Sequence, residues 1–339
     1  MTLENIEQAN NKILSFTKKL KLPQLYRKRK NKLQSASDGQ KFSVDGDTIF
    51  SSYSPKYFGS DKGVTVYSYT DERNLLFSST VFNSNEYEAT YVLDGLLNNP
   101  VIKSSTHTTD SHGATEVIFG MMQLFGFKFI PRLKKLYQKK LYSFERKSTY
   151  KNNQYPILPH SYINEQLIIN YWDEILRMIC SVKLKYCTAS QIFKRLNSYS
   201  GQHPVYRALK EYGRISKTIH ILRMIDDVEL RQNMTKQLNK IERSNQFSKA
   251  VCFSNNSKLI FLHKNEQEIS QAATRLIKNS IICWNYLYLE KCLDKVKTKQ
   301  ERSFLLEKIL SGSAIAWKHI HFSGHYDFSE SNMDNDLLL

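Results

Sequence analysis

The chain has 339 residues, 41% of them hydrophobic, so it can bury sizeable cores in about two domains and is not a disordered chain. No apolar run approaches the roughly 18 residues of a membrane-spanning helix, and the first thirty residues lack the apolar segment of a signal peptide. The 49 Lys and Arg residues against 32 Asp and Glu give a net charge of +17. This excess favours a polyanionic partner, nucleic acid before membrane, although a solvated basic surface has the same charge.

The N-terminal unit, residues 1–34, combines a helix with a basic segment. Apolar residues at helical spacing predict a helix from Ile6 to Leu20, which Pro23 ends. The basic run Arg27-Lys28-Arg29-Lys30 follows. Such a run is usually a solvated linker, but beside an active site it would follow a phosphate backbone.

Residues 35–131 are typical of a mixed sheet with two helices. Helices are predicted at 86–97 and in the apolar segment that ends at Phe125. The order β-β-β-α-β-α-β fits a ribonuclease-H-like fold, in which three antiparallel strands precede strands joined by helices. The strand-like runs are 35–44, 63–70, 75–82, the run that starts at Thr106, and 127–130.

From residue 132 onward, helical patterns dominate. Residues 132–226 are interpreted as a helical insertion, 227–327 as a helix followed by C-terminal helices, and 328–339 as a frayed acidic tail. The predicted fold class is α/β: a ribonuclease-H-like mixed-sheet core interrupted by an all-helical insertion, with a helical C-terminal region. The predicted helices are 163–180, 188–197, 203–225, 227–247 and 266–295.

Asp110 stands where a predicted strand ends and the chain turns through Gly113. Open α/β sheets usually place their chemistry at the carboxyl ends of strands. Asp110 or Ser111 is equally suited to cap the following helix. Taken alone, the cap is the simpler interpretation.

A second acid interrupts a hydrophobic stripe on the predicted helix 227–247. Leu230, Met234 and Leu238 are four residues apart, and Glu242 is the next step on the face toward the core. A buried unpaired carboxylate is costly, so Glu242 pairs with a base or binds a metal. The alternative is that this end of the stripe emerges into solvent.

Asp38, in the first predicted strand, completes a set of three acids with Asp110 and Glu242. Converging carboxylates supply hard oxygen ligands for Mg²⁺. Two ions about 3.5–4 Å apart assist an in-line displacement at phosphorus. The separation between Asp110 and Glu242 is too long for a plain ribonuclease-H-like core, and a helical insertion at 132–226 would account for it.

Nine segments, in order along the chain, resemble motifs of the DDE transposases of replicative class II bacterial transposons, the Tn-three family. Each motif alone is weak, but together they cover nearly the whole chain. The segments are 35–42 (SASDGQKF), 91–97 (YVLDGLL), 109–113 (TDSHG), 125–132 (FGFKFIPR), 172–177 (WDEILR), 211–215 (EYGRI), 238–242 (LNKIE), 279–289 (NSIICWNYLYL) and 317–320 (WKHI).

The resemblance implies that Asp38, Asp110 and Glu242 are the catalytic triad and ligands of Mg²⁺, with Mn²⁺ as a substitute. It implies 3′-end cleavage and strand transfer in replicative transposition. The implied partners are double-stranded DNA, as transposon ends and target, and further copies of the chain on that DNA. We expect a bacterial, cytoplasmic protein that associates with the nucleoid.

Two features separate the chain from the family. Family members are much longer, with amino-terminal regions that bind the terminal inverted repeats, and we expect this chain to lack them. The family has Gly where Ile241 precedes Glu242, and a β-branched residue there would crowd approaching DNA. The competing hypothesis is a truncated remnant that binds DNA or a full-length relative without transposing alone.

Basic residues near the acids are the candidates for DNA contact, although an ordinary solvated charge explains most of them equally well. Lys240 and Arg243 are the best because they flank Glu242. Gln40 and His112 are candidates to position water or phosphate, or to hydrogen-bond a metal ligand. The candidates for DNA contact are Arg132, Lys134, Lys135, Arg214, Lys217, Lys240 and Arg243.

Other cofactors are not expected. The sequence contains neither G-x-x-x-x-G-K-[ST] nor G-x-G-x-x-G, so we predict no nucleotide cofactor. The five cysteines are odd in number and have no C-x-x-C spacing, which predicts reduced thiols and no zinc site.

Overall fold

The structure is a computed structural model that describes residues 2–28, 32–45, 48, 50–198, 203–252, 258–260 and 263–325. For His112 and Asn197 the backbone alone is described. The acidic tail expected at 328–339 lies outside the described residues. No described helix combines the length and the apolar character needed to cross a membrane.

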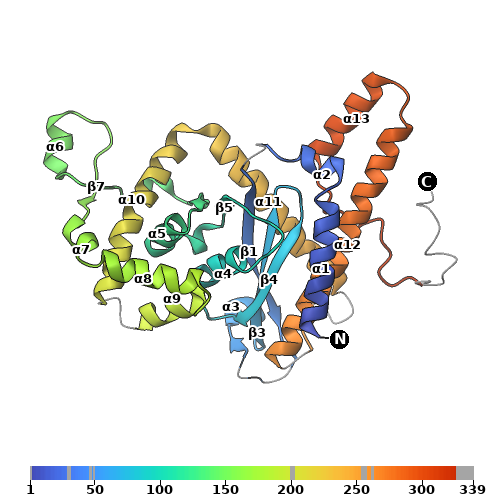
Figure 1. The fold of residues 1–339 in the computed structure, drawn as a ribbon, viewed down its shortest axis with the longest axis horizontal. Helices are drawn as coiled ribbons and strands as arrows, with labels where there is room; N and C mark the ends of the chain where they lie inside the picture. The colour runs from blue at the N-terminus through green and yellow to red at the C-terminus, as the bar shows by residue number, and fades with distance from the viewer. Residues whose placement is uncertain are drawn as a thin grey trace.

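One mixed sheet forms the centre of the molecule (Figure 1). Its main order is β4-β3-β1-β5-β6, and β2 pairs with the start of β3. The β1, β3 and β4 strands are antiparallel neighbours, whereas β5 and β6 run parallel to β1. The strands are β1 (Gln34–Ser43), β2 (Ser52–Tyr53), β3 (Lys62–Asp71), β4 (Leu76–Asn83), β5 (Thr106–Thr108) and β6 (Lys128–Phe129).

Helices cover both faces of this sheet (Figure 1). In the first half of the chain the helices are α1 (Leu3–Thr17), α2 (Lys21–Leu25), α3 (Pro55–Phe58), α4 (Val92–Leu97) and α5 (Glu116–Leu124), with 3₁₀ turns η1 (Glu88–Tyr91) and η2 (Ser111–Gly113). In the second half they are η3 (Leu136–Gln138), α6 (Lys147–Asn152), α7 (Glu165–Asn170), α8 (Trp172–Lys183), α9 (Ala189–Ser198), α10 (Pro204–Asp226), α11 (Val228–Val251), α12 (Lys264–Lys295) and α13 (Lys299–Ser311).

The two helical layers differ in their position along the chain. Helices α1, α11 and α12 lie on one side of the sheet, where they contact β1, β3 and β4. Helices α4 and α5 cover the other side, and α8, α9 and α10 lie outside them (Figure 1). The sheet therefore lies between two helical layers: the N- and C-terminal helices on one side, and helices from the middle of the chain on the other.

The β-branched and aromatic residues that predicted the strands are buried in the structure. Tyr67 and Tyr69 of β3 are almost fully buried and belong to the largest hydrophobic cluster. The predicted stripe on α11 is confirmed, because Leu230, Met234 and Leu238 pack against Ala36 of β1. This contact places α11 directly over the first strand.

Several element boundaries differ from the predictions. The first helix ends at Thr17, and Pro23 lies inside α2 instead of ending a helix. The helix predicted at 163–180 is two helices that meet at Tyr171. The stretch 132–226 is not wholly helical, because β7 (Tyr142–Ser143) and β8 (Ser161–Tyr162) pair in parallel within it.

A close helix crossing joins this stretch to the sheet. Helix α10 packs along α5, and a Cβ added at Gly213 would lie 1.7 Å from the carbonyl oxygen of Glu116. Only glycine fits at this position. Lys217, one turn further along α10, then binds Glu116 Oε1 at 2.6 Å.

Candidate active site

Asp38 lies within β1, opposite Ser68 of β3. Its carboxyl group is largely buried, and its pKa is raised to about 7. Burial is the main cause; the nearby carboxylates of Glu88, Asp110 and Glu242 add to it, and a hydrogen bond from the Gly39 backbone opposes it. The three acids selected from the sequence are thus electrostatic neighbours.

Asp110 follows β5 by two residues, at the carboxyl end of a strand parallel to β1. Its side chain makes no capping hydrogen bond to the turn η2. The hydroxyl of Thr115 caps α5 instead, by accepting from Ile118 N–H. The capping interpretation of Asp110 and Ser111 is therefore wrong, and the Asp110 carboxylate is available for other contacts.

Glu242 projects from α11 with 52% of its side chain exposed. Here the hydrophobic stripe ends, and the expectation that Glu242 continues it into the core is wrong. Ile241 is fully buried in the cluster that joins α11 to β1. Its side chain points into the protein, so the expected crowding of the site by Ile241 does not occur.

Two cations occupy the oxygens of Asp110. Arg132 Nε lies 3.2 Å from Oδ1, and Lys134 Nζ lies 3.2 Å from Oδ2. Arg132 also reaches Glu242, with 3.8 Å between Nη2 and Oε1. Burial acts to raise the Asp110 pKa, but the Ser111 backbone, Lys134 and Arg132 together lower it. Asp110 therefore stays ionised, while its neighbour Asp38 is easily protonated.

Asn245 connects α11 to the first strand. It lies three residues after Glu242, on the same side of the helix. Its Nδ2 donates to Asp38 Oδ2 at 3.1 Å. Asn245 was not predicted from the sequence, although residues three positions apart on a helix, such as Glu242 and Asn245, have neighbouring side chains.

Two buried polar atoms next to Asp38 have no hydrogen-bond partner among the described residues. They are Gln40 Nε2 and Asn245 Oδ1. Gln40 lies two residues from Asp38 in β1, so both side chains project from the same face of the sheet, and Asn245 donates to Asp38 through its other amide atom. Buried polar groups normally have partners, so the surroundings of Asp38 are polar and incompletely satisfied.

Glu88 is a fourth acid near the site. Its carboxylate lies against Gly39, where an added Cβ would be 2.6 Å from Oε1. Lys41 Nζ is 3.9 Å from the same oxygen. Periodicity gave no signal for Glu88, because its approach to β1 depends on how η1 packs against the sheet. A side chain at this glycine of the segment SASDGQKF would push the Glu88 carboxylate away from β1.

A buried histidine supports the strand pair beneath the acids. His107 of β5 contacts the Ser35 hydroxyl through Nδ1 and the Ser37 hydroxyl through Nε2, each at 2.8 Å. Burial lowers the His107 pKa to about 3, so the ring is neutral. The two serines before Asp38 thus align β1 with β5 by side-chain hydrogen bonds.

The remaining candidates for DNA contact are scattered. Lys135 is exposed, and Arg243 is exposed beside Glu242. Arg214 pairs with Glu211 and lies over the Tyr142 ring, with 4.5 Å to its centroid. Lys217 is neutralised by Glu116.

Lys240 is not a surface charge. Its Nζ donates to the Glu72 carbonyl, and burial lowers its pKa to about 8. The side chain of His112 lies outside the described residues.

Among the described residues, no three His, Cys, Asp or Glu side chains are arranged closely enough to hold a metal ion. The oxygens of Asp110 are instead paired with Arg132 and Lys134. The site thus combines one buried acid, one acid bound to cations and one exposed acid.

Comparison with known proteins places this arrangement in a family. The chain matches the Tn3 transposase DDE domain over residues 1–326. It is 32% identical over 332 residues to the transposase for transposon Tn1546 of Enterococcus faecium, covering 96% of this chain and 33% of the relative. It is 33% identical over 306 residues to the transposase for transposon Tn501 of Pseudomonas aeruginosa, covering 89% and 30%.

A third relative is the transposase for transposon gamma-delta of Escherichia coli (strain K12), 29% identical over 340 residues, with 99% of this chain and 33% of the relative covered. The chain spans about a third of the length of these curated relatives and matches them along nearly its whole length. The mixed α/β fold, the cluster of acids and these similarities agree. The chain belongs to the Tn3 transposase DDE domain family.

Proposed function

We propose that the chain catalyses the DNA chemistry of transposition: metal-dependent cleavage at the 3′ ends of the transposon and transfer of those ends to target DNA. The observation that carries the proposal is the grouping of Asp38, Asp110 and Glu242, three acids from distant parts of the chain that interact electrostatically. Their elements, β1, the end of β5 and α11, meet at one edge of the sheet. Replicative transposition is the proposed outcome.

We further propose a ribonuclease-H-like core made of residues 35–131 and the helix of Glu242 in the unit 227–327. The strand order β4-β3-β1-β5-β6 supports it, with three antiparallel strands first and parallel strands after. Residues 132–226 are then the insertion, and 1–34 precede the core. The contact of α11 with β1 completes the core from beyond the insertion.

The residues fit a divalent cation by the chemistry of their donors. Asp38, Asp110 and Glu242 offer hard carboxylate oxygens of the kind that Mg²⁺ and Mn²⁺ prefer, and the partnerless Oδ1 of Asn245 lies beside them. When bound, Mg²⁺ ions would activate the attacking oxygen and stabilise the leaving oxygen. For Asp110 to serve as a ligand, Arg132 and Lys134 must release its oxygens.

Each residue then has a part in the proposed reaction. Asp38, Asp110 and Glu242 would hold the cations, and Asn245 orients the Asp38 carboxylate through its hydrogen bond. Once released, Arg132 and Lys134 are placed to bind phosphate oxygens of the DNA. Gln40 Nε2, which is buried without a partner, is a donor for a phosphate or a water molecule.

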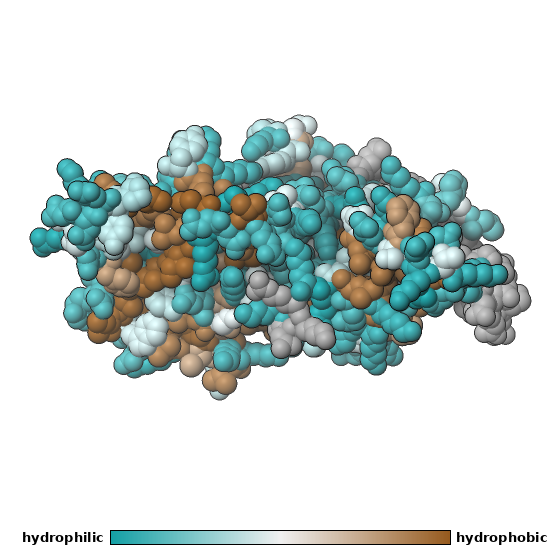
Figure 2. Space-filling model, turned by 90° about the horizontal axis from the view of Figure 1, so that it is seen from above, coloured by the Kyte–Doolittle hydropathy of each residue, from teal (hydrophilic) through white to brown (hydrophobic). Residues whose placement is uncertain are grey.

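We propose double-stranded DNA as the partner, bound by more than one copy of the chain in the bacterial cytoplasm. Exposed apolar side chains of the middle stretch support an assembly. Tyr137 and Tyr186 are 83% and 82% exposed, and Figure 2 shows hydrophobic residues gathered at the end of the molecule formed by the middle of the chain in Figure 1. Light scattering with and without DNA measures the number of copies.

Strand transfer in vitro tests the function. A pre-nicked transposon-end oligonucleotide and a supercoiled target are incubated with the chain and Mg²⁺ or Mn²⁺, beside Asp110→Ala. Joined product that requires metal and disappears in the variant is the expected result. DNA binding without product, equal in both proteins, would instead identify a remnant that binds DNA and does not react.

A further inference from the structure

A basic cavity lies beside the acids, on another side of α11. Its volume is about 570 Å³, within the range of ligand-binding pockets. The walls come from α2 and the residues after it, the start of β1, the turn between β3 and β4, α11, and the end of α13 with the residues after it. Parts of the chain that are distant in sequence therefore form one cavity.

The charged groups in the walls of this cavity are mostly cations. Five basic side chains face a single acid, so the cavity favours an anion. Lys240 is held between the Glu72 carbonyl and the ring of Tyr26, with 5.2 Å to its centroid. The charged lining residues are Arg27, Lys28, Lys236, Lys240, Arg243 and Glu72.

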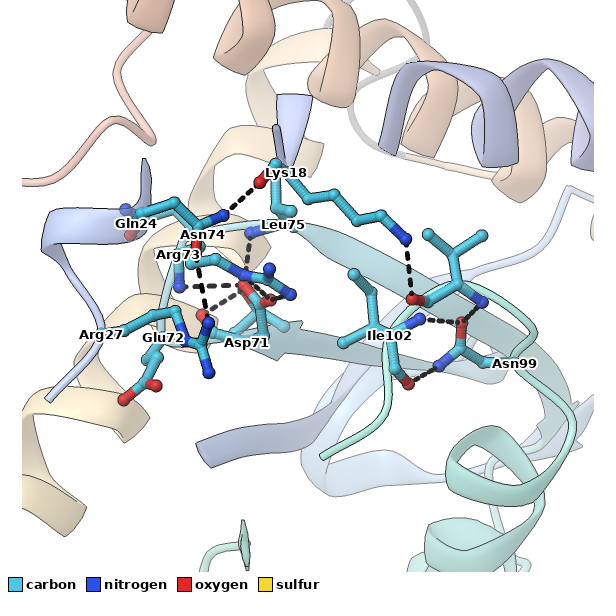
Figure 3. Close-up of polar contacts among 12 residues, drawn as sticks. Lys18, Gln24, Arg27, Asp71, Glu72, Arg73, Asn74, Leu75, Asn99 and Ile102 are labelled. Atoms are coloured by element: carbon cyan, nitrogen blue, oxygen red, sulfur yellow. Dashed lines mark hydrogen bonds and ion pairs between the residues drawn. The ribbon is translucent and has the colours of Figure 1, made fainter. Parts of the chain in front are cut away.

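Glu72 is fixed by a rigid turn (Figure 3). Asp71, which is fully buried, accepts hydrogen bonds from Arg73 N–H at 2.9 Å, Arg73 Nε at 2.7 Å and Leu75 N–H at 3.0 Å. The Glu72 N–H donates to the Gln34 carbonyl at 2.9 Å. The turn therefore cannot easily move Glu72 away from the cavity.

The carboxyl group of Glu72 is only partly satisfied. The residue is 6% exposed, and its Oε1 has no hydrogen-bond partner among the described residues. Figure 3 shows the side chain of Arg27 beside it. Burial raises the pKa of Glu72 to about 7, so this acid is easily protonated and opposes an anion in the cavity only weakly at neutral pH.

The cavity follows the helix that carries Glu242. Lys236, Lys240 and Arg243 are spaced by four and three residues, so they lie along one face of α11. From Lys236 to Arg243 the helix rises about 10 Å. Arg243 is adjacent to Glu242, and the row of cations therefore leads away from the acids.

We propose that this cavity binds the sugar–phosphate backbone of one DNA strand as the strand leaves the site of Asp38, Asp110 and Glu242. Phosphates fit the row of cations, and the size of the cavity suits one or two nucleotides and excludes a duplex. The inference rests on the proposed function for the identity of the ligand. It adds Arg27, Lys28 and Lys236 to the proposed DNA contacts. Lys240 would contact the strand in this cavity instead of beside the acids.

Fluorescence anisotropy with a labelled 15-nucleotide single strand, in EDTA, tests the proposal without any chemistry. Lys236→Gln removes an exposed cavity cation, and Lys249→Gln removes an exposed cation of α11 outside the cavity. We expect Lys236→Gln to weaken binding about 3- to 10-fold and to reduce the salt slope by about 0.7, as for one phosphate contact on a single strand. Lys249→Gln is expected to change binding less than twofold.

Glu72→Gln gives a change of opposite sign. At pH 8, above the Glu72 pKa of about 7, the carboxyl group is mostly ionised. The substitution keeps the shape of the side chain and removes this charge, so binding of the single strand at pH 8 is expected to tighten about 2- to 5-fold. Circular dichroism confirms that each variant is folded. Equal effects of Lys236→Gln and Lys249→Gln, or weaker binding by Glu72→Gln, overturn the proposal.

Two further arms separate the possible ligands. Inorganic phosphate at 10 mM is added as a competitor. If phosphate abolishes strand binding completely, and to the same extent in the native and Lys236→Gln proteins, the cavity is a site for free phosphate and the proposal is overturned. A blunt duplex of equal length is expected to respond less to Lys236→Gln than the single strand does. Asp110→Ala frees Arg132 and Lys134 and is expected to bind the single strand at least as tightly as the native chain does. Failed strand transfer by the native chain, with its cavity binding intact, would refute the proposed function alone.

Discussion

Asn245 Nδ2 donates a hydrogen bond of 3.1 Å to Asp38 Oδ2, joining two residues that are 207 positions apart in the chain. This contact holds the helix of Glu242 to the strand of Asp38. The other amide atom, Oδ1, is buried and has no hydrogen-bond partner in the part of the chain that the structure describes. Asn245 therefore controls the direction in which the most buried carboxylate of the site points.

Replacement of Asn245 by Ala is expected to lower strand transfer about 10- to 100-fold, the usual cost of losing a group that orients a metal ligand. The Mn²⁺ concentration at half-maximal rate is expected to rise. Gln246→Ala, an exposed neighbour on the same helix, is the control and is expected to retain activity. An unchanged Mn²⁺ dependence in Asn245→Ala would show that the hydrogen bond does not orient Asp38.

We expect Arg132 to compete with a divalent cation for the Asp110 carboxylate. Because Arg132 Nε lies 3.2 Å from Asp110 Oδ1, Arg132→Gln is expected to tighten Mn²⁺ binding about 3- to 10-fold without DNA, as measured by calorimetry. The same variant is expected to weaken DNA binding. Lys135→Gln removes a nearby charge that is exposed in the structure and is the matched control; weaker Mn²⁺ binding by Arg132→Gln would contradict the competition.

The crossing of α5 and α10 depends on the absence of a side chain at Gly213. With 1.7 Å between an added Cβ and the Glu116 carbonyl oxygen, Gly213→Ala is expected to lower the free energy of unfolding by about 3 kcal/mol or more. Gly312→Ala meets its nearest atom at 3.4 Å and is expected to have little effect. Urea unfolding of both variants measures the difference, and equal stability would refute the close crossing.

Lys278 gives the protein a pH-dependent stability. The side chain is buried against Ser244 and Ser248, with 2.6 Å between Nζ and Ser248 Oγ, and burial lowers its pKa to about 7. The unfolded chain binds this proton up to about pH 10.5, so between pH 7 and 10.5 it holds more protons than the folded protein. The contribution of Lys278 to the free energy of unfolding therefore rises with pH in this window.

Replacing Lys278 by Met is expected to remove this dependence. At pH 6 the charged, buried ammonium is costly, and the variant is expected to be more stable than the native chain by about 1–3 kcal/mol. At pH 9 the difference is expected to shrink. Urea unfolding at the two pH values measures this; Lys249→Met, an exposed residue of α11, is expected to show no such change.

Much of the fold follows from local patterns. Alternating β-branched and aromatic residues placed β3, and the four-residue spacing of Leu230, Met234 and Leu238 placed the buried face of α11. The break at Tyr171 was not predicted, because the hydrophobic pattern continues through it. Periodicity reports buried faces but does not report where a helix changes direction.

The candidate site was predictable only in part. Asp110 at the end of a strand was found from the sequence, since strand ends follow from local pattern. Asn245, Glu88 and the contacts of Arg132 were missed, because each depends on parts of the chain that approach one another only after folding. Lys240 was expected to contact DNA beside Glu242, but in the structure it packs against Tyr26 from a distant part of the chain.

The most direct test of the central claim changes the chemistry of one proposed metal ligand. Strand transfer by Asp110→Cys is compared in Mg²⁺ and in Mn²⁺ or Cd²⁺, beside Asp110→Ala, because a thiolate binds softer cations better than it binds Mg²⁺. Metal ligation by Asp110 predicts that the Cys variant is inactive in Mg²⁺ and regains at least about tenfold activity in the softer ions, while the Ala variant stays inactive in all. Activity of the Ala variant in Mg²⁺, or a Cys variant that no softer ion restores, would contradict it.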